Sequence, residues 1–291
     1  MIRFSKSKLN TFISCPEKYY LHYELGVRAT KTSRTLVEGS CIHHLVESGL
    51  MFRNNMSDVL QQASRNFWND HPRERCDYED DVDYLAAQDL CLRQSIAFLE
   101  QLGPLQTISV ELHLESNLIN PITLEEDFSI SLIGYIDLVI RDLDGNPWLI
   151  DLKTVKKSPR EGMSKVALEL SMYSYLYSVP FNDINIPAIP VALIYLIRTK
   201  TPQVKWDESR RSLGHYVDLH ATCKSVADLI QQGHFWRNPG LHCSYCDMSS
   251  LCYGEDAVAI EVFGEEGLES YRANQSRRDT INLEDLEEVA F

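Results

Sequence analysis

Hydrophobic positions change their spacing along the 291-residue chain. Over residues 36–50 apolar side chains recur every three or four positions, which predicts an amphipathic helix. Helical spacing continues over residues 56–102, with a break near His71 and Pro72. From Ile108 to Leu114 the spacing becomes two, which is typical of a strand with one buried face.

The second half of the chain predicts a hairpin followed by a helix and another strand. Residues 129–141 and 148–153 are strand-like, and the turn sequence Asp144-Gly145-Asn146 lies between them. Apolar positions at helical spacing follow over residues 166–177, and residues 191–197 form a continuous apolar run typical of a buried strand. The order helix, strand, strand, strand, helix, strand predicts an α/β fold.

The net charge of the chain argues against one class of nucleic-acid-binding protein. The chain has 28 basic and 42 acidic residues, for a net charge of −14, and this excess argues against coating nucleic acid by bulk electrostatics. Residues 254–291 alone carry eleven acidic and three basic residues. We expect this segment to be an acidic, partly disordered tail without a catalytic role.

The longest apolar run, Ile186 to Ile197, is too short to span a bilayer and contains two prolines. We therefore expect a cytoplasmic protein with no membrane partner. Eight cysteines without a secretion signal do not indicate a disulfide framework. Four of them are isolated in sequence and are interpreted as ordinary small residues: Cys41, Cys76, Cys91 and Cys223.

Two acids and a lysine lie on the arms of the predicted hairpin. Asp137 is on one arm, and Asp151 and Lys153 are on the other, where alternation puts both side chains on one face. Both acids interrupt apolar strands, where an unpaired charge is costly. Carboxylates favour Mg²⁺ or Mn²⁺, and such an ion lowers the pKa of a bound water. The pattern favours a hydrolytic metal site over a surface salt bridge.

These residues resemble the PD-(D/E)XK nuclease superfamily, in its RecB-like branch that includes the CRISPR-associated iron-sulfur nucleases. That family has a Gly-x-x-x-His helix, a Gly-x-x-Asp strand and an acid-x-Lys strand in this order. Here residues 39–43, 134–137 and 151–153 match them. The resemblance spans roughly residues 5–253. It implies a restriction-endonuclease-like core, with a mixed central sheet flanked by helices and a helical insertion.

The resemblance also implies roles. His43, Asp137 and Asp151 would bind the divalent ion together with the backbone carbonyl of Leu152, and Lys153 would be the catalytic lysine. Where the family has a Gln-x-x-x-Tyr helix, this chain has Glu169 and Tyr173. Glu169 cannot donate the hydrogen bonds of an amide, so its part near the metal or the DNA is open, and Tyr173 equally fits an aromatic core position. Glu111 is a further candidate acid, although an outward-facing strand position is the favoured interpretation.

A second constellation consists of Cys243, Cys246 and Cys252, three thiols within ten residues. This spacing indicates metal or iron-sulfur binding, and a fourth ligand is needed. From spacing alone zinc with His242 is nearly as good an interpretation as iron-sulfur. The resemblance favours a [4Fe-4S] cluster closed by Cys15, because the family has a similar Cys-Pro near its start. Such a cluster would join the two chain ends.

The leading hypothesis is a metal-dependent DNA exonuclease acting on single strands or DNA ends, in recombination, repair or CRISPR-type adaptation, with protein partners there. The alternatives are a structure-specific endonuclease and a non-catalytic DNA-binding scaffold. Stacking on bases is assigned to Tyr173, Tyr175 or Tyr19. Backbone contacts are assigned to Lys6, Lys8, Lys18, Lys156, Lys157, Arg160 and Lys165.

The same analysis divides the chain into five segments. Residues 1–33 carry the first cluster cysteine, 34–103 are the helical region with His43, 104–220 are the nuclease core, 221–253 bind the cluster and 254–291 are the tail.

Overall fold

The computed structural model describes residues 1–52, 55–103, 106–179, 189–199 and 201–287. The chain forms two compact units. Unit 1 comprises Met1–Ser7 and Thr32–Ala227, and unit 2 comprises Lys8–Lys31 and Asp228–Phe291. The helical region 34–103 and the expected core 104–220 thus belong to one unit, whereas unit 2 joins segments from both ends of the chain.

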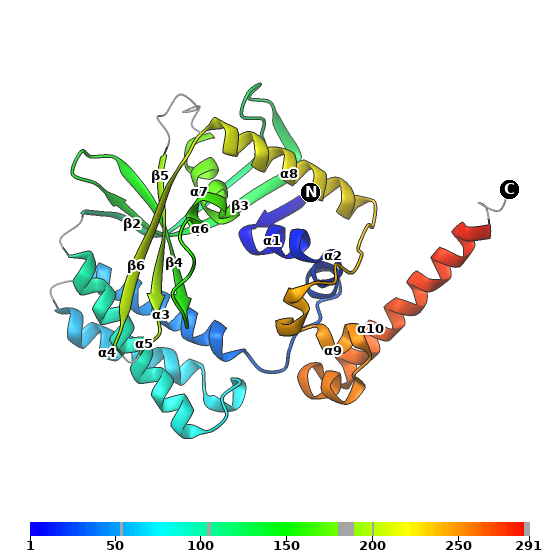
Figure 1. Ribbon diagram of the computed structural model, residues 1–291, viewed down its shortest axis with the longest axis horizontal. Helices are drawn as coiled ribbons and strands as arrows, with labels where there is room; N and C mark the ends of the chain where they lie inside the picture. Colours follow the sequence, from blue (N-terminus) through cyan, green and yellow to red (C-terminus); the bar gives the residue numbers. More distant parts are fainter. Residues whose placement is uncertain (53–54, 104–105, 180–188, 200, 288–291) are drawn as a thin grey trace. The chain divides into compact units, whose positions relative to one another are not determined.

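Unit 1 is built on a mixed sheet, which has six strands in the described part of the chain (Figure 1). The strand order is β1-β3-β4-β5-β6, and β2 pairs with the other edge of β3. The β1–β3 and β4–β5 pairs are parallel and the others antiparallel. The bounds are β1 Ile2–Ser5, β2 Gln106–Ile119, β3 Glu126–Arg141, β4 Pro147–Val155, β5 Ile189–Ile197 and β6 Gln203–Arg211.

Helices pack on both faces of this sheet, so the α/β expectation is confirmed. An apolar core lies on each face of the sheet, and successive residues of β4 point into one or the other. Ile150 and Leu152 pack with α3, α4 and α5, whereas Leu149 packs with α7. β5 is buried along its whole length, as its continuous apolar run predicts. The helices are α3 Arg34–Met51, α4 Met56–Asp70, α5 Asp81–Leu102, α6 Met163–Val166, α7 Leu168–Ser178 and α8 Leu213–Gln231.

The β3–β4 hairpin forms as predicted, but its two strands separate before the sheet ends. Pairing runs from Arg141 and Pro147 to Leu138 and Ile150 and stops there. The next positions in this register are Asp137 and Asp151. Beyond Ile150, β4 remains paired only with β5 among the described strands. We call this opening between β3 and β4 the fork.

β1 approaches the fork from the opposite end. It runs parallel to β3 and pairs with it from Ile2 and Ile130 to Ser5 and Ile133. Its C-terminal end therefore points along β3 toward Asp137, and the next residue is Lys6.

Unit 2 combines short helices from the two chain ends. The N-terminal part has α1, Lys6–Ser14, which begins in unit 1, followed by α2, Pro16–Tyr19, and a π-helical turn over residues 20–24. The break at Pro16 agrees with the sequence. The C-terminal part has a 3-10 helix over residues 241–245, then α9, Ser249–Tyr253, and α10, Asp256–Glu287, which is kinked at Gly264.

The first half of the segment expected to be an acidic tail packs within unit 2, and the expectation of partial disorder over residues 254–291 stays a prediction. α10 contributes Ala259, Phe263, Leu268 and Tyr271 to a buried cluster with Leu21 and other residues of unit 2. These four apolar positions are spread among many acids, so net charge hid a helix with one buried side.

No helix among the described residues is both long enough and apolar enough to cross a membrane. The apolar run 191–197, predicted as a buried strand, lies within β5, whereas positions 186–188 of the longer apolar run Ile186 to Ile197 fall outside the described residues.

Candidate active site

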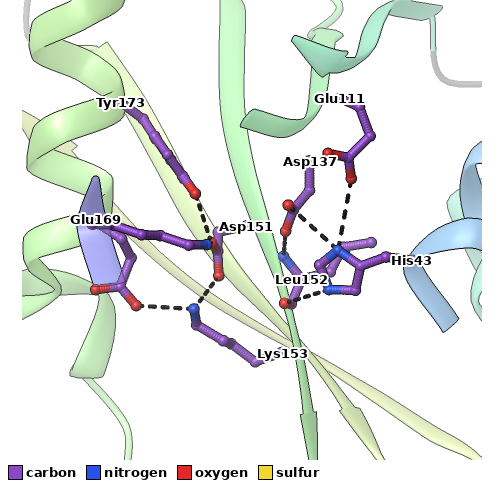
Figure 2. A network of polar contacts seen from close by, with 9 residues as sticks. His43, Glu111, Asp137, Asp151, Leu152, Lys153, Glu169 and Tyr173 are labelled. Atoms are coloured by element: carbon purple, nitrogen blue, oxygen red, sulfur yellow. Dashed lines mark hydrogen bonds and ion pairs between the residues drawn. The ribbon is translucent and has the colours of Figure 1, made fainter. Parts of the chain in front are cut away.

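Three side chains of types that can bind metal converge at the fork, as Figure 2 shows. They are His43 from α3, Glu111 from β2 and Asp137 from β3, and one ligand atom of each lies within 4.8 Å of the others. His43 Nδ1 is 3.4 Å from Asp137 Oδ1 and 3.7 Å from Glu111 Oε1. We call these residues the acid-histidine group.

Close helix packing positions His43. Gly39 lies one turn earlier on α3, and a Cβ there would be 3.4 Å from Thr154 Oγ1 on β4. A Cβ at this position would make an ordinary van der Waals contact, so α3 lies close to β4 here. His43 Nε2 is 3.1 Å from the carbonyl oxygen of Leu152, to which it donates. This hydrogen bond to β4 orients the imidazole ring.

Backbone geometry turns the two acids toward His43. The β2–β3 register pairs Val110 with Leu138 and Leu112 with Ile136, so Glu111 falls opposite Asp137. Glu111 has a φ of 48°, an unfavourable value for a residue with a Cβ. Val110 packs against the α3 side of the sheet and Leu112 against the α7 side, so the alternation switches at Glu111.

This distortion overturns the favoured interpretation of Glu111 as an outward-facing acid. Strict alternation would keep Val110 and Leu112 on one face, but the switch brings the Glu111 carboxylate to His43. The sequence carried no glycine or asparagine to signal a positive φ at this position.

The acid-histidine group is arranged to hold a positive charge. Because Nε2 of His43 donates to Leu152, Nδ1 faces two carboxylates. Burial lowers the pKa of His43, but the hydrogen bonds and charge of Asp137 and Glu111 outweigh it and raise the pKa to about 10. One nitrogen and two carboxylates also form a donor set suited to Mg²⁺ or Mn²⁺. The residues therefore fit a divalent ion.

The Asp137 side chain bonds to β4 at the point where backbone pairing between β3 and β4 has ended. It is only 6% exposed, and its Oδ2 accepts a hydrogen bond of 2.6 Å from the backbone nitrogen of Leu152. Burial and the nearby charge of Asp151 raise its pKa. The carboxylate thus bridges the fork where backbone pairing has ended.

Asp151 is held differently. It is fully buried, and Lys6 Nζ and Lys153 Nζ each lie 2.6 Å from one of its two oxygens. Tyr173 donates a longer hydrogen bond of 3.3 Å to Oδ1. Burial raises the pKa of Asp151, but the charges of Lys153 and Lys6 outweigh burial and lower the pKa overall.

Lys153 is positioned by two acids. Besides Asp151, it contacts Glu169 Oε1 of α7 at 3.0 Å (Figure 2). Burial lowers the pKa of Lys153, and the charges of Asp151 and Glu169 outweigh this effect and raise it. Glu169 therefore orients the lysine by an ion pair, which an amide at this position could not do.

The structure brings together at the fork most of the residues that the sequence assigned to the active site. These are His43, Asp137, Asp151, Leu152, Lys153, Glu169 and Tyr173.

The three tyrosines assigned to base stacking do not suit that role. Tyr173 and Tyr175 are 0% exposed and Tyr19 is 3% exposed, so these assignments are wrong. The tyrosine of the helix motif packs instead under Gly134, where a Cβ would lie 3.1 Å from its ring. Sequence reasoning also missed Lys6, which it assigned to the DNA backbone.

The cysteines form a separate site within unit 2. Cys15, Cys243, Cys246 and Cys252 line one cavity of about 140 Å³, together with His242. All four are free thiols. His242 Nε2 is buried without a hydrogen-bond partner in the described chain. A set of four thiols and one unpartnered imidazole fits a thiolate-bound metal group.

The other four cysteines lie outside this cavity. All four are buried, as expected of ordinary small residues: Cys41, Cys76, Cys91 and Cys223.

Comparison with solved structures agrees with this architecture. The structure is similar to a crystal structure of a "putative exonuclease" from Eubacterium rectale, with a TM-score of 0.50 and 14% sequence identity, covering 84% of this chain and 86% of that one. A second match, SSO0001, has a TM-score of 0.39 and 14% identity, and covers 82% of this chain and 94% of that one. The similarity to the first of these structures concerns the fold alone. No curated protein matches the sequence.

Comparison with protein families is more specific. The family model described as the PD-(D/E)XK nuclease superfamily matches residues 3–253, which include the acid-histidine group, the fork and the cysteine cavity. The matched region covers most of the chain and carries an acidic site fit for a divalent ion. The chain therefore belongs to the PD-(D/E)XK nuclease superfamily and is an enzyme of the nuclease class.

Proposed function

We propose that this nuclease is a RecB-like, metal-dependent DNA exonuclease that degrades single strands or DNA ends. The observation that carries the proposal is the fork, where the acid-histidine group adjoins the buried Asp151–Lys153 pair. The order of the motifs at residues 39–43, 134–137 and 151–153 supports the RecB-like branch. The pathway would be recombination, repair or CRISPR-type adaptation.

In this proposal the fork residues divide the chemistry. His43, Asp137 and Asp151, with the carbonyl of Leu152, hold Mg²⁺ or Mn²⁺, and Glu111 adds a further carboxylate. When bound, the ion lowers the pKa of a water molecule and neutralises charge on the phosphodiester. Lys153, held by Asp151 and Glu169, directs its ammonium group to that water or to the scissile phosphate.

The segment after β4 supplies a path for the DNA backbone. Lys156, Lys157, Arg160 and Lys165 are all exposed and follow the strand that carries Lys153. A local run of cations can bind phosphates although the whole chain is acidic. Lys6 and Lys18 are less suited to this role, because each is already paired with an aspartate.

Linear and circular substrates test the activity. With Mn²⁺ we expect end-labelled linear single-stranded DNA to be degraded, and covalently closed single-stranded circles to survive. Cutting of circles would favour the structure-specific endonuclease instead. The Lys153→Met protein, prepared identically, measures contaminating nuclease. Absence of cleavage of any DNA by the wild type, with DNA binding retained, would favour the non-catalytic scaffold.

For unit 2 we propose a structural [4Fe-4S] cluster bound by Cys15, Cys243, Cys246 and Cys252. The supporting observation is that these thiols line one cavity although the first is more than two hundred residues from the others. Burial raises the pKa of Cys246, and it raises that of Cys252 to about 11, so bound metal must displace their protons.

Metal analysis separates iron-sulfur from zinc. Protein purified without oxygen should be brown and contain about four irons per chain, whereas one zinc per chain would refute the cluster. Cys15→Ala should lose the colour, and Cys223→Ala, which alters a buried cysteine outside the cavity, should keep it. If His242→Ala loses the colour and Cys15→Ala keeps it, His242 is the fourth ligand.

A further inference from the structure

Lys6 reaches the fork because of β1. The parallel pairing of β1 with β3 ends at Ser5 and Ile133, four residues before Asp137. The following residue, Lys6, therefore enters the space that β4 vacates, and its Nζ lies 2.6 Å from Asp151 Oδ1. Its side chain is 31% exposed, whereas that of Asp151 is 0% exposed. The contact is thus largely withdrawn from water.

This contact satisfies an acid that the family motif assigns to the metal. Lys153 already occupies Oδ2 of Asp151 at 2.6 Å, and Lys6 occupies Oδ1. Both oxygens are paired with ammonium groups, and Asp151 is not part of the acid-histidine group in this structure. A divalent ion that binds Asp151 must compete with Lys6, because two cations at one buried oxygen repel each other strongly.

We propose that Lys6 is a built-in counter-cation that stabilises the fork without metal and is displaced from Asp151 when the divalent ion binds. The proposal rests on the proposed metal-dependent function and adds a residue to it. Lys6 also lies over the ring of Tyr173, with Nζ 5.2 Å from its centre. This cation–π contact is made by the same Nζ that pairs with Asp151, so it adds to the attraction that holds Lys6 at the fork without metal. Lys6 is therefore a positioning residue.

Manganese binding measures the competition. Wild-type protein and three single variants, all full-length with the metal site stripped by chelator, are titrated with Mn²⁺ by calorimetry. Lys6→Met should bind Mn²⁺ about tenfold more tightly, a typical coupling between two ligands. Lys6→Arg retains the cation and should bind like the wild type. Lys31→Met removes an exposed lysine of unit 2 and should also leave Mn²⁺ affinity unchanged.

Stability supplies the second readout. Without metal, Lys6→Met should melt several degrees below the wild type, because a buried carboxylate loses one of its two cations. Saturating Mn²⁺ should remove most of this difference, since tighter binding stabilises the variant more. A lysine that only supports the fold would leave the same difference with and without the ion. Lys6→Gln, which retains a hydrogen-bond donor, replaces Lys6→Met if that variant does not fold.

The outcomes separate this proposal from the proposed function. If the wild type binds Mn²⁺ and Asp137→Asn abolishes binding, the metal site is correct. Unchanged or weaker Mn²⁺ affinity in Lys6→Met, or in Lys6→Gln, then overturns the role of Lys6 alone. If the wild type binds no Mn²⁺, the metal-dependent function fails and this inference fails with it.

Discussion

The fork of unit 1 and the cysteine cavity of unit 2 both gather side chains that can bind metal, but the surroundings of these side chains differ. At the fork, His43 faces Asp137 and Glu111, and two lysines hold Asp151. In the cavity, the thiols of Cys246 and Cys252 have raised pKa values and stay protonated at neutral pH. The fork carries its own counter-cations, whereas the thiols of Cys246 and Cys252 keep their protons without metal.

The difference fits the use that we propose for each site. A site that must bind and release an ion and a charged substrate benefits from acids that are already oriented, so internal cations stabilise it. A structural site binds its metal as it folds, so metal binding adds directly to folding free energy. We therefore expect the two sites to respond in opposite ways when metal is removed.

Loss of the proposed cluster should have the largest effect. Stripping metal from the cavity should unfold much of unit 2, because α2 and α9, which carry residues next to the cysteines, are very short and the apolar cluster of unit 2 is small. Chelating only the divalent ion should shift the melting temperature slightly. Circular dichroism and limited proteolysis between residues 228 and 287 measure both. Equal responses to the two treatments would contradict the comparison.

Lys153→Met should have the next largest effect, a fall in kcat of about a thousandfold on linear DNA, because in the proposed mechanism Lys153 stabilises charge that develops in the transition state. Mn²⁺ binding should persist in this variant. Asp137→Asn should lose Mn²⁺ binding and cleavage together. Calorimetry and single-turnover cleavage distinguish the two, and wild-type turnover by Lys153→Met would remove the fork from consideration as the active site.

Sequence patterns predicted the parts of this molecule that depend on local order. The hairpin, the helix carrying His43 and the convergence of Asp151 with Lys153 all follow from spacing and alternation along nearby residues. β1 has only four residues and β6 is mainly polar, so neither gave a periodic signal. The position of Lys6 depends on parallel pairing between residues more than a hundred apart, which a single sequence does not specify.

The error at Glu111 has a different origin. Alternation along a strand assumes extended backbone at every position, and a φ of 48° breaks that assumption at one residue. Similarly, periodicity predicts that Tyr173 lies on a helix but not that Asp151 takes its hydroxyl hydrogen bond. Both cases concern contacts made at the fork, where the structure departs from regular pairing.

The Glu111 distortion leads to a prediction of intermediate size. Glu111→Gln should weaken Mn²⁺ binding about tenfold, because one carboxylate of the acid-histidine group is lost. Glu111→Gly should weaken binding equally, but without metal it should be about 1 kcal/mol more stable than Glu111→Gln, since glycine adopts a positive φ without strain. Calorimetry and urea unfolding measure the two quantities.

Glu115→Gln is the matched control on the same strand, because Glu115 pairs with Arg3 and lies outside the acid-histidine group. It should leave Mn²⁺ affinity unchanged. If Glu111→Gln binds Mn²⁺ as tightly as Glu115→Gln, Glu111 is not a ligand, and the distortion needs another explanation.

The smallest effect is expected at a surface acid that contrasts with Asp151. Asp127 of β3 accepts hydrogen bonds from Lys224 and Ser129, which lower its pKa to about 2. Its side chain is 23% exposed and that of Lys224 is 45% exposed, so solvent screens the pair. Asp127→Asn should therefore cost about 0.5 kcal/mol at pH 7.

The pH dependence of this small effect has a defined sign. The folded-state pKa of Asp127 lies below its unfolded value of about 3.9, so the charged form stabilises the fold above that value. The stabilisation is lost as pH falls from about 4 toward 2. Urea unfolding at pH 7, 4 and 3 should show the difference between wild type and Asp127→Asn shrinking. A difference that persists unchanged at pH 3 would mean that Asp127 stabilises the fold through packing and not through its charge. Solvent exposure would then not explain the contrast between Asp127 and the buried Asp151.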